Sequence, residues 1–325
     1  MAALATGLNF CGISVEVRGE WDEIRQAIRH DFGAFCAGSA DLSAKGAFCV
    51  ELIRSSHDRG WKRLLRGPRS SLFIAPPGER RVCFFDKVSV CYRYQARRAQ
   101  IWSLDSEAAF EALYYVLLSY VGERLDERGW HRLHGFGFSG KRRAVVLATS
   151  GTGKSTLAWS ILRRPGFEFY SDDTPLVNSK GEIAAFPQRI ALEDRPKGIT
   201  ARAFKRVRNK TKYVVGHDSF REKIAETGVL QDLYWLRQDD SPGLSKAPRH
   251  LFVIPLLKWL VLGYETPQIW ELYLRFTPSD ILSKIRILNS RLRAANCLLW
   301  GTRQFIINRD SKDKTAKWLV AHARS

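Results

Sequence analysis

The sequence predicts an α/β protein, and three observations support this fold class. The apolar run 144–147 leads into Ala-Thr-Ser-Gly-Thr-Gly-Lys-Ser-Thr at 148–156, and a segment with helical spacing follows. Strand-like segments dominate residues 1–105, whereas helical spacing dominates the C-terminal part. We therefore expect an α/β core between a β-rich N-terminal module and a helical C-terminal region, with domains at 1–105 and 106–325.

The N-terminal module is predicted from short alternating segments. Ser14–Arg18 alternates like a strand, and Val82–Tyr94 predicts a hairpin that turns at residues 86–87. Glu20–Phe35 has the spacing of a helix. The residues of this module show no catalytic spacing, so we expect a scaffold or a recognition module.

The rest of the chain begins with a long helix, capped by Asp105 or Ser106 and ended by Gly129. Two apolar runs, 131–138 and 142–149, then predict a hairpin-like connection into the glycine-bearing segment. Near the C-terminus we expect three elements: a helix over Pro278–Leu298 capped by Ser279, a strand over Arg303–Asn308 and a short helix over Lys312–His322.

Residues 148–156 have the spacing of a P-loop, with Ala148 in place of the first glycine. In a P-loop, backbone N–H groups cradle the β-phosphate of a nucleotide, the lysine reaches the β- and γ-phosphates, and the hydroxyl binds Mg²⁺. We therefore expect ATP and Mg²⁺ as cofactors, with Ser155 on the metal. The expected nucleotide-binding residues are Ser150, Gly151, Thr152, Gly153, Lys154, Ser155 and Thr156.

Two adjacent carboxylates, Asp172 and Asp173, follow Lys154 by 18 and 19 residues at the end of a predicted strand, 167–171. In a parallel α/β sheet this end of the strand faces the same crevice as the P-loop. One carboxylate there can hold Mg²⁺ through water, and a second can accept the proton of an attacking hydroxyl. The alternative interpretation is an Asx turn into residues 174–175.

Three motifs occur together in residues 130–190: His134-Gly135 in Leu-His-Gly-Phe-Gly-Phe, the Ser-Gly-Thr-Gly-Lys-Ser segment, and Tyr-Ser-Asp-Asp at 170–173. In this combination the segment resembles the catalytic domain of HPr kinase/phosphorylase. It is most similar to the HPr-kinase-related proteins of unknown substrate, which include kinases of ribosomally made peptides. The resemblance implies a P-loop kinase-like core and ATP- and Mg²⁺-dependent phosphorylation of serine in a peptide or small protein.

The resemblance also assigns roles to residues of this sequence. Lys154 binds the phosphates, and His134 lies close enough to orient the γ-phosphate. Of Asp172 and Asp173, one is the base and the other a metal-binding or orienting group; we place Asp173 with Ser155 on the metal. The expected catalytic residues are Asp172, Asp173, Lys154 and His134.

The segment also departs from the HPr kinases. Thr156 stands where those kinases usually have Glu, and their C-terminal signature is not recognisable here. We therefore expect neither phosphorylase activity nor HPr as the substrate. Arg189 falls within a short motif of the relatives and is a candidate for stabilising transferred charge, with an ordinary surface arginine as the alternative.

The chain is strongly basic, with a net charge of +19. This charge favours an anionic partner, such as an acidic peptide, a nucleic acid or a membrane surface. Eight basic and no acidic residues lie between 195 and 212, where the spacing of 201–208 is partly helical; a substrate clamp and a solvated surface segment are the two interpretations. ATP is favoured over GTP because Asn209–Lys212 lacks the aspartate of a guanine-binding motif.

Two other functions fit parts of the sequence. The first is a nucleotide-dependent binding or regulatory protein that engages nucleic acid, although no helix-turn-helix, zinc finger or RNP motif is present. The second is a membrane-surface protein that uses the apolar run Leu251–Tyr264, which is too short to cross a bilayer.

The six cysteines are scattered, without C-x-x-C spacing, and the N-terminus lacks the pattern of a signal peptide. We therefore expect a reduced, cytoplasmic protein without a transmembrane segment. The sequence leaves homo-oligomerisation open.

Overall fold

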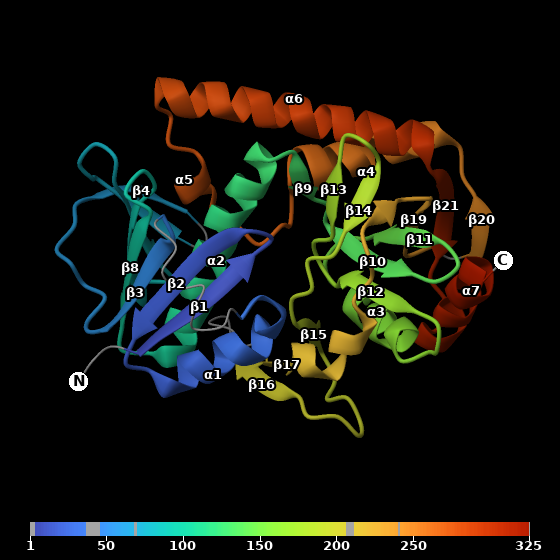
Figure 1. The fold of residues 1–325 in the computed structure, drawn as a ribbon, viewed down its shortest axis with the longest axis horizontal. Helices are drawn as coiled ribbons and strands as arrows, with labels where there is room; N and C mark the ends of the chain where they lie inside the picture. Colours follow the sequence, from blue (N-terminus) through green and yellow to red (C-terminus); the bar gives the residue numbers. More distant parts are fainter. Residues whose placement is uncertain (1–3, 37–45, 68–69, 206–210, 240, 325) are drawn as a thin grey trace. The chain divides into compact units, whose positions relative to one another are not determined.

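A computed structural model describes residues 4–36, 46–67, 70–205, 211–239 and 241–324 of the chain (Figure 1). The fold is mixed α/β. The chain forms two compact units: unit 1 is Met1–Arg124, Arg202–Tyr213 and Pro267–Asp280, and unit 2 is Leu125–Ala201, Val214–Thr266 and Ile281–Ser325. The expected domains, 1–105 and 106–325, were each continuous. The structural units are not, because segments distant in sequence join the N-terminal module.

An eight-stranded sheet forms most of unit 1, in the order β1-β2-β3-β8-β7-β6-β5-β4. β2, β3 and β8 run parallel, and the other neighbours are antiparallel. The expected hairpin at residues 86–87 is confirmed, since β6 and β7 flank it. The strands are β1 Leu4–Phe10, β2 Ile13–Gly19, β3 Phe48–Arg54, β4 Arg63–Arg66, β5 Ser70–Phe73, β6 Arg80–Phe84, β7 Val88–Arg93 and β8 Arg98–Ser103.

Helix α2 (Ser106–Glu127) packs its aromatic side chains on this sheet. The rings of Phe48 and Tyr120 stack at 3.9 Å, and Tyr115 stacks on Phe84. The expected cap is confirmed as Asp105, whose carboxylate accepts a hydrogen bond from the backbone N–H of Ala108. The expected helix over 20–35 is confirmed as α1 (Asp22–Asp31) with a short 3₁₀ turn, Gly33–Phe35.

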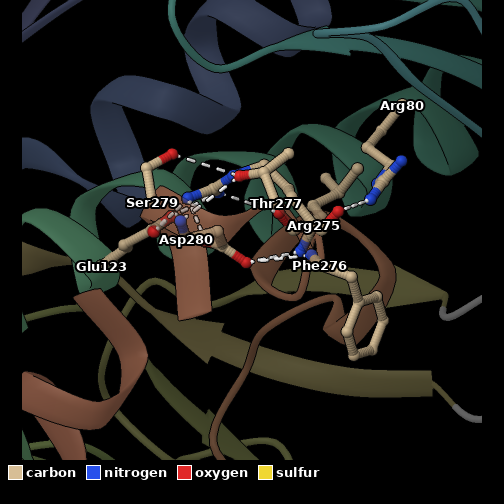
Figure 2. A network of polar contacts seen from close by, with 8 residues as sticks. Arg80, Glu123, Arg275, Phe276, Thr277, Ser279 and Asp280 are labelled. Carbon is tan, nitrogen blue, oxygen red and sulfur yellow. Dashed lines mark hydrogen bonds and ion pairs between the residues drawn. The ribbon is translucent and has the colours of Figure 1, made fainter. Parts of the chain in front are cut away.

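A buried ion-pair network fastens the segment 267–280 within unit 1 (Figure 2). Both carboxylate oxygens of Glu123 accept hydrogen bonds from the Arg275 guanidinium, at 2.5 and 2.8 Å, and Asp280 accepts a third at 2.7 Å. Burial alone would lower the pKa of Arg275, but these two carboxylates outweigh it and raise that pKa above its ordinary value. Arg80 donates to the backbone carbonyl of Arg275. The short helix α5 (Trp270–Tyr273) is thereby tied to α2.

The C-terminal helix starts at Pro278 as expected, but its expected cap is wrong. Helix α6 spans Pro278–Gly301, and Thr277, not Ser279, is its cap. The Thr277 hydroxyl accepts a hydrogen bond from the N–H of Asp280, while the Asp280 carboxylate accepts one from the N–H of Phe276. Thr277 is therefore the cap, with proline at the first helical position, and Ser279 lies inside the helix.

The helical spacing expected in residues 201–208 is wrong for the described part, where β16 (Arg202–Lys205) is a strand followed by β17 (Thr211–Val215). Residues 206–210 lie outside the described residues. Arg202 donates to both oxygens of the buried Asp31 carboxylate, and Phe204 is buried. Alternation between these inward side chains and exposed ones favours a strand.

Unit 2 contains a six-stranded sheet in the order β12-β10-β11-β19-β21-β20. β11, β19 and β21 run parallel, and β10 is antiparallel to both β11 and β12. β12 therefore runs in the direction of β11, and the carboxyl ends of β11, β12, β19 and β21 meet at one edge. The strands are β10 Gly135–Ser139, β11 Arg143–Leu147, β12 Glu168–Ser171, β19 Asp232–Arg237, β20 Gly243–Lys246 and β21 Arg303–Asn308.

Helices cover both faces of this sheet (Figure 1). On one face, Val145, Leu147 and Leu233 pack with α6 and with α4 (Val253–Leu256) and its π-helical continuation, Leu257–Val261. The other face meets α3 (Lys154–Leu162) and α7 (Lys312–Arg324), where His322 packs on Tyr234 and Phe305. The expected C-terminal strand and final helix are confirmed as β21 and α7.

A smaller four-stranded sheet completes unit 2, in the order β18-β14-β13-β9. Its strands are short: β9 Trp130–Arg132, β13 Leu176–Asn178, β14 Glu182–Ala184 and β18 Gly228–Val229; the remaining short elements are β15 Ile190–Leu192 and 3₁₀ turns at His217–Ser219, Arg221–Lys223 and Arg249–Phe252.

A buried chain of hydrogen bonds anchors α6 to β9 within unit 2. His131 bonds to Asp126 through Nδ1 and to Ser290 through Nε2, at 2.8 Å each. Arg291 donates to both oxygens of Asp126 and to the backbone carbonyl of Val261. Burial would raise the pKa of Asp126, but Arg291 and His131 lower it to about 2. Because Arg291 already neutralises this carboxylate, we interpret the chain as a structural anchor.

In the part of the chain that the structure describes, no helix has the length and apolarity needed to cross a bilayer. Within the apolar run Leu251–Tyr264, residues 253–261 form α4 and its π-helical continuation.

Candidate functional site

The site is built around the glycine loop, residues 148–153, which connects β11 to α3. Gly151 and Gly153 have positive φ angles of 89° and 86°, a conformation in which a side chain is strained. The Thr152 hydroxyl donates to the carbonyl of Thr149 at 2.8 Å and closes the turn. Gly153 caps α3 in the left-handed conformation, and no side chain of the described residues caps this end of the helix.

Lys154, the first residue of α3, is buried, and its ammonium group lies between two polar side chains. Its Nζ atom is 2.8 Å from Oδ1 of Asp173 and 2.9 Å from Nε2 of His134. His134 precedes β10 and Asp173 follows β12, so adjacent strands deliver both partners to the edge at which β11 ends. The structure thus brings together three of the four expected catalytic residues.

The fourth, Asp172, is buried beside the first turn of α3. Its burial, together with the nearby charge of Asp173, raises its pKa to about 6, against the opposing effects of Lys154 and of hydrogen bonds from the Ser155 hydroxyl and the Ala191 amide. Its Oδ1 atom has no hydrogen-bond partner among the described residues. A carboxylate oxygen without a partner in a buried position leaves room for a ligand with positive charge.

Ser155 and Asp172 place two side-chain oxygen groups together at the start of α3, joined by the hydrogen bond from the Ser155 hydroxyl. Mg²⁺ is held in proteins by one or two carboxylates together with water and substrate phosphates. Within the described residues, no group of three or more His, Cys, Asp or Glu side chains is arranged to hold a metal ion by itself.

Asp173 was the carboxylate expected on the metal, and the structure places it on Lys154. Its side chain is 42% exposed, whereas that of Lys154 is only 7% exposed. Asp173 also lies 3.4 Å from Nδ1 of His134. Of the two aspartates it is the one that is exposed to solvent, since Asp172 is buried.

Two residues that the sequence did not point to also reach this site. Glu265, with a positive φ of 64°, accepts a hydrogen bond from the N–H of Ser150 at 3.0 Å and lies 3.2 Å from Nε2 of His134. The hydrogen bond from His134, and then that from Ser150, lower the pKa of Glu265 against the effect of burial. No sequence motif precedes Glu265, which ends the loop after the apolar run 251–264.

Arg309 is the second such residue. It follows β21, and its guanidinium donates to the carbonyl of Thr152 at 2.9 Å. A side chain at Gly153 would meet this guanidinium at about van der Waals distance. The parallel order of β11, β19 and β21 explains its position, because it brings the carboxyl end of β21 to the glycine loop, although Arg309 lies 157 residues after Thr152.

The other residues singled out in the sequence lie in or near the glycine loop and between two strands. Gly151 is exposed in the loop, Thr156 is half-buried in the first turn of α3, and Arg189 is half-buried between β14 and β15.

Comparison of the chain with protein-family models finds no match, and comparison with curated proteins finds none either. A family for this chain is therefore argued only from its short motifs and the site just described.

Proposed function

We propose that unit 2 is an ATP- and Mg²⁺-dependent kinase with a P-loop kinase-like core, related to the HPr kinases. It transfers the γ-phosphate to a hydroxyl group, in the first place a serine of a peptide or small protein. The observation that carries the proposal is the 2.8 Å contact between Lys154 Nζ and Asp173 Oδ1. It joins the lysine of a glycine loop to an adjacent carboxylate pair, which is the combination that phosphoryl transfer uses.

The triphosphate binds along the glycine loop in this proposal. Loop amides and the N-terminus of α3 face the β-phosphate, and Lys154 neutralises the β- and γ-phosphates. Ser155 and Asp172 hold Mg²⁺, which supplies charge neutralisation at the phosphates. The assignment of the metal carboxylate thereby moves from Asp173 to Asp172, since the Ser155 hydroxyl bonds to Asp172.

Asp173 is the proposed base. Binding of the phosphates draws the ammonium of Lys154 toward them and releases Asp173 to accept the proton of the acceptor hydroxyl. The acceptor oxygen then forms a bond to the γ-phosphorus, and the bond from this phosphorus to the β–γ bridging oxygen breaks, leaving its electron pair on ADP. His134, 2.9 Å from Lys154 Nζ, orients the γ-phosphate.

The charge of the chain supports an acidic acceptor, since a net charge of +19 attracts acidic peptides. The six cysteines are scattered without C-x-x-C spacing, which supports a reducing compartment, and the need for ATP supports the cytoplasm.

Transfer of radiolabelled phosphate from ATP to the peptides and small proteins encoded beside this chain tests the proposal. We expect wild type and Lys317→Ala, a control at an exposed lysine on α7, to label an acceptor and Lys154→Ala to lose labelling. Equal labelling by Lys154→Ala would contradict the assignment.

The second candidate is a nucleotide-dependent binding protein for nucleic acid, favoured only by the charge of +19. In the described part of the basic segment, Arg202 is already paired with Asp31 and lies over the rings of Phe110 and Phe204. This pairing supports a structural role for Arg202. A salt titration separates the candidates, because affinity for nucleic acid would fall steeply as salt rises.

A further inference from the structure

Exposed apolar side chains of unit 2 are concentrated in two helical segments. Thirteen large hydrophobic residues of this unit are exposed among the residues whose exposure the structure describes, and all except Val229 lie within 251–264 or 281–300. Scattered exposed apolar residues need no explanation, but a concentration of this kind marks an interaction surface.

Helix α6 presents one of these segments as a stripe. Ile281, Ile285, Leu288 and Leu292 are all at least 40% exposed and follow one another at intervals of four, three and four residues. At about 100° per residue, this spacing keeps them within a sector of roughly 60° on the helix. A different face of α6, which includes Ala294 and Leu298, is buried in the core of unit 2. The helix therefore has an inward and an outward apolar face.

The second segment, 249–264, lies antiparallel beside α6. Arg291 donates to the carbonyl of Val261, and the Arg249 guanidinium lies 5.0 Å from the centre of the Trp300 ring. One end of each segment is therefore next to the opposite end of the other. Figure 1 shows α4 beside the C-terminal half of α6. On this segment Ile254 is 74% exposed and Leu262 is 60% exposed.

Both segments are basic. Residues 249–264 and 281–301 contain no acidic residue, and apart from Arg291, which is buried against Asp126, they contain five arginine and lysine residues: Arg249, Lys258, Lys284, Arg286 and Arg293. Two exposed aromatic rings, Trp300 and Tyr264, lie at the ends of the segments. The Arg249 guanidinium lies over the Trp300 ring, and the Lys258 ammonium lies over the Tyr264 ring. Aromatic rings beside basic side chains are the combination found where a protein meets the headgroup region of a membrane.

We propose that these two segments form a docking surface for an anionic lipid bilayer. The apolar side chains enter the interface between headgroups and acyl chains, and the basic side chains bind lipid phosphates. A second copy of the chain would bring like charges together. A single partner helix would cover one apolar stripe, whereas a bilayer surface covers both segments at once. The proposal does not depend on phosphoryl transfer.

Flotation of the full chain with vesicles tests the surface. We expect binding to vesicles of phosphatidylcholine with phosphatidylglycerol, weakening as salt rises, and little binding to phosphatidylcholine alone. The double variant Ile285→Glu, Leu288→Glu should lose at least about tenfold in binding, because two charges would enter the apolar interface. The matched control is Val229→Glu, Leu104→Glu, at two exposed apolar residues elsewhere, which should bind like wild type.

Basic residues are tested in the same way. Arg286→Gln with Arg293→Gln should weaken binding several-fold, and Lys314→Gln with Lys317→Gln, on α7, should not. Thermal melting of each variant verifies that it folds, and Lys154→Ala should bind vesicles like wild type even where it has lost phosphoryl transfer.

Three results would overturn the proposal. One is wild type that stays with neither kind of vesicle, and another is an Ile285→Glu, Leu288→Glu variant that binds as well as its control. The third combines two observations. Wild type does not bind vesicles, but it forms a dimer, or a complex with an acidic helical peptide, that the Ile285→Glu, Leu288→Glu variant does not form. That outcome would assign the surface to a protein partner.

Discussion

The carboxylate of Glu265 accepts a hydrogen bond from the backbone N–H of Ser150, with 3.0 Å between Oε2 and the nitrogen. The Ser150 amide therefore already binds an anionic group of the protein itself. In the proposed kinase, a nucleotide phosphate and Glu265 compete for this amide and for the surroundings of His134 and Lys154. Glu265 therefore has to move before the triphosphate binds in full.

The variant Glu265→Gln removes the competing charge. We expect it to bind ATP about three- to tenfold more tightly than wild type, since an uncharged amide competes less well for the loop N–H and for the cation beside it. Isothermal titration with ATP measures the change, and Glu222→Gln, at an exposed glutamate of the same unit, is the control. Weaker binding by Glu265→Gln would show that Glu265 assists the nucleotide instead.

The raised pKa of Asp172 predicts that this residue lowers the free energy of unfolding at high pH. Because its pKa in the folded protein is about 6, above the ordinary 3.8, the contribution of this group is fully favourable below about pH 4 and is lost as pH rises through 6. Above that range the buried charge costs up to roughly 3 kcal/mol. Asp172→Asn should therefore be more stable than wild type at about pH 8, where the carboxylate is charged, while losing phosphoryl transfer.

Urea unfolding at about pH 8 and pH 4.5 measures this difference, which should shrink at the lower value as the carboxylate becomes protonated. If Asp172→Asn is less stable than wild type at both values, the carboxylate has a structural role and the account of its pKa is wrong.

The lowered pKa of Asp126 predicts the opposite dependence of stability on pH. Its pKa of about 2 means that its contribution to stability is present above about pH 4 and is lost as pH falls toward 2. Asp126→Asn leaves Arg291 buried without its ion pair, so we expect a loss of about 3–5 kcal/mol at neutral pH. Asp239→Asn, in an exposed pair with Arg237, should cost less than about 1 kcal/mol. Similar losses for the two variants would contradict the anchoring role.

Ser155 predicts a metal-specific defect. Ser155→Ala should bind ATP without Mg²⁺ as wild type does, but should lose most of the gain in affinity that Mg²⁺ provides, because one oxygen donor is missing. The control is Ser160→Ala, farther along α3. Titrations with and without Mg²⁺ measure the difference. An equal gain from Mg²⁺ in Ser155→Ala and wild type would remove Ser155 from the metal site.

Local patterns were sufficient to predict much of the fold. The hairpin at 86–87, the cap at Asp105 and the long helices α2 and α6 follow from turn residues, caps and periodicity that act within a few residues of sequence. The strand β16 was not predictable in this way, because it depends on Asp31, which lies 171 residues away and receives the Arg202 side chain. The discontinuous units have the same cause, since the ion pair of Glu123 with Arg275 joins segments that no local pattern connects.

Some residues of the candidate site could likewise be predicted from local spacing, and others could not. Lys154, Ser155, Asp172 and Asp173 lie within 20 residues of one another, and their spacing was sufficient to group them. Glu265 and Arg309 reach the glycine loop through tertiary structure alone, one from a loop beyond the apolar run and the other from the end of β21. The different surroundings of Asp172 and Asp173, on which their proposed roles rest, also required coordinates, because adjacent residues at a strand end point in different directions.

Binding of ATP with Mg²⁺ to wild type and to Lys154→Ala, measured by isothermal titration, tests the central claim most directly. We predict binding by wild type that Mg²⁺ strengthens, and affinity at least about tenfold lower in Lys154→Ala, which lacks the ammonium that faces the phosphates. Wild type that binds no ATP, or a Lys154→Ala variant that binds it equally well, would contradict the claim that a triphosphate is held at residues 148–156.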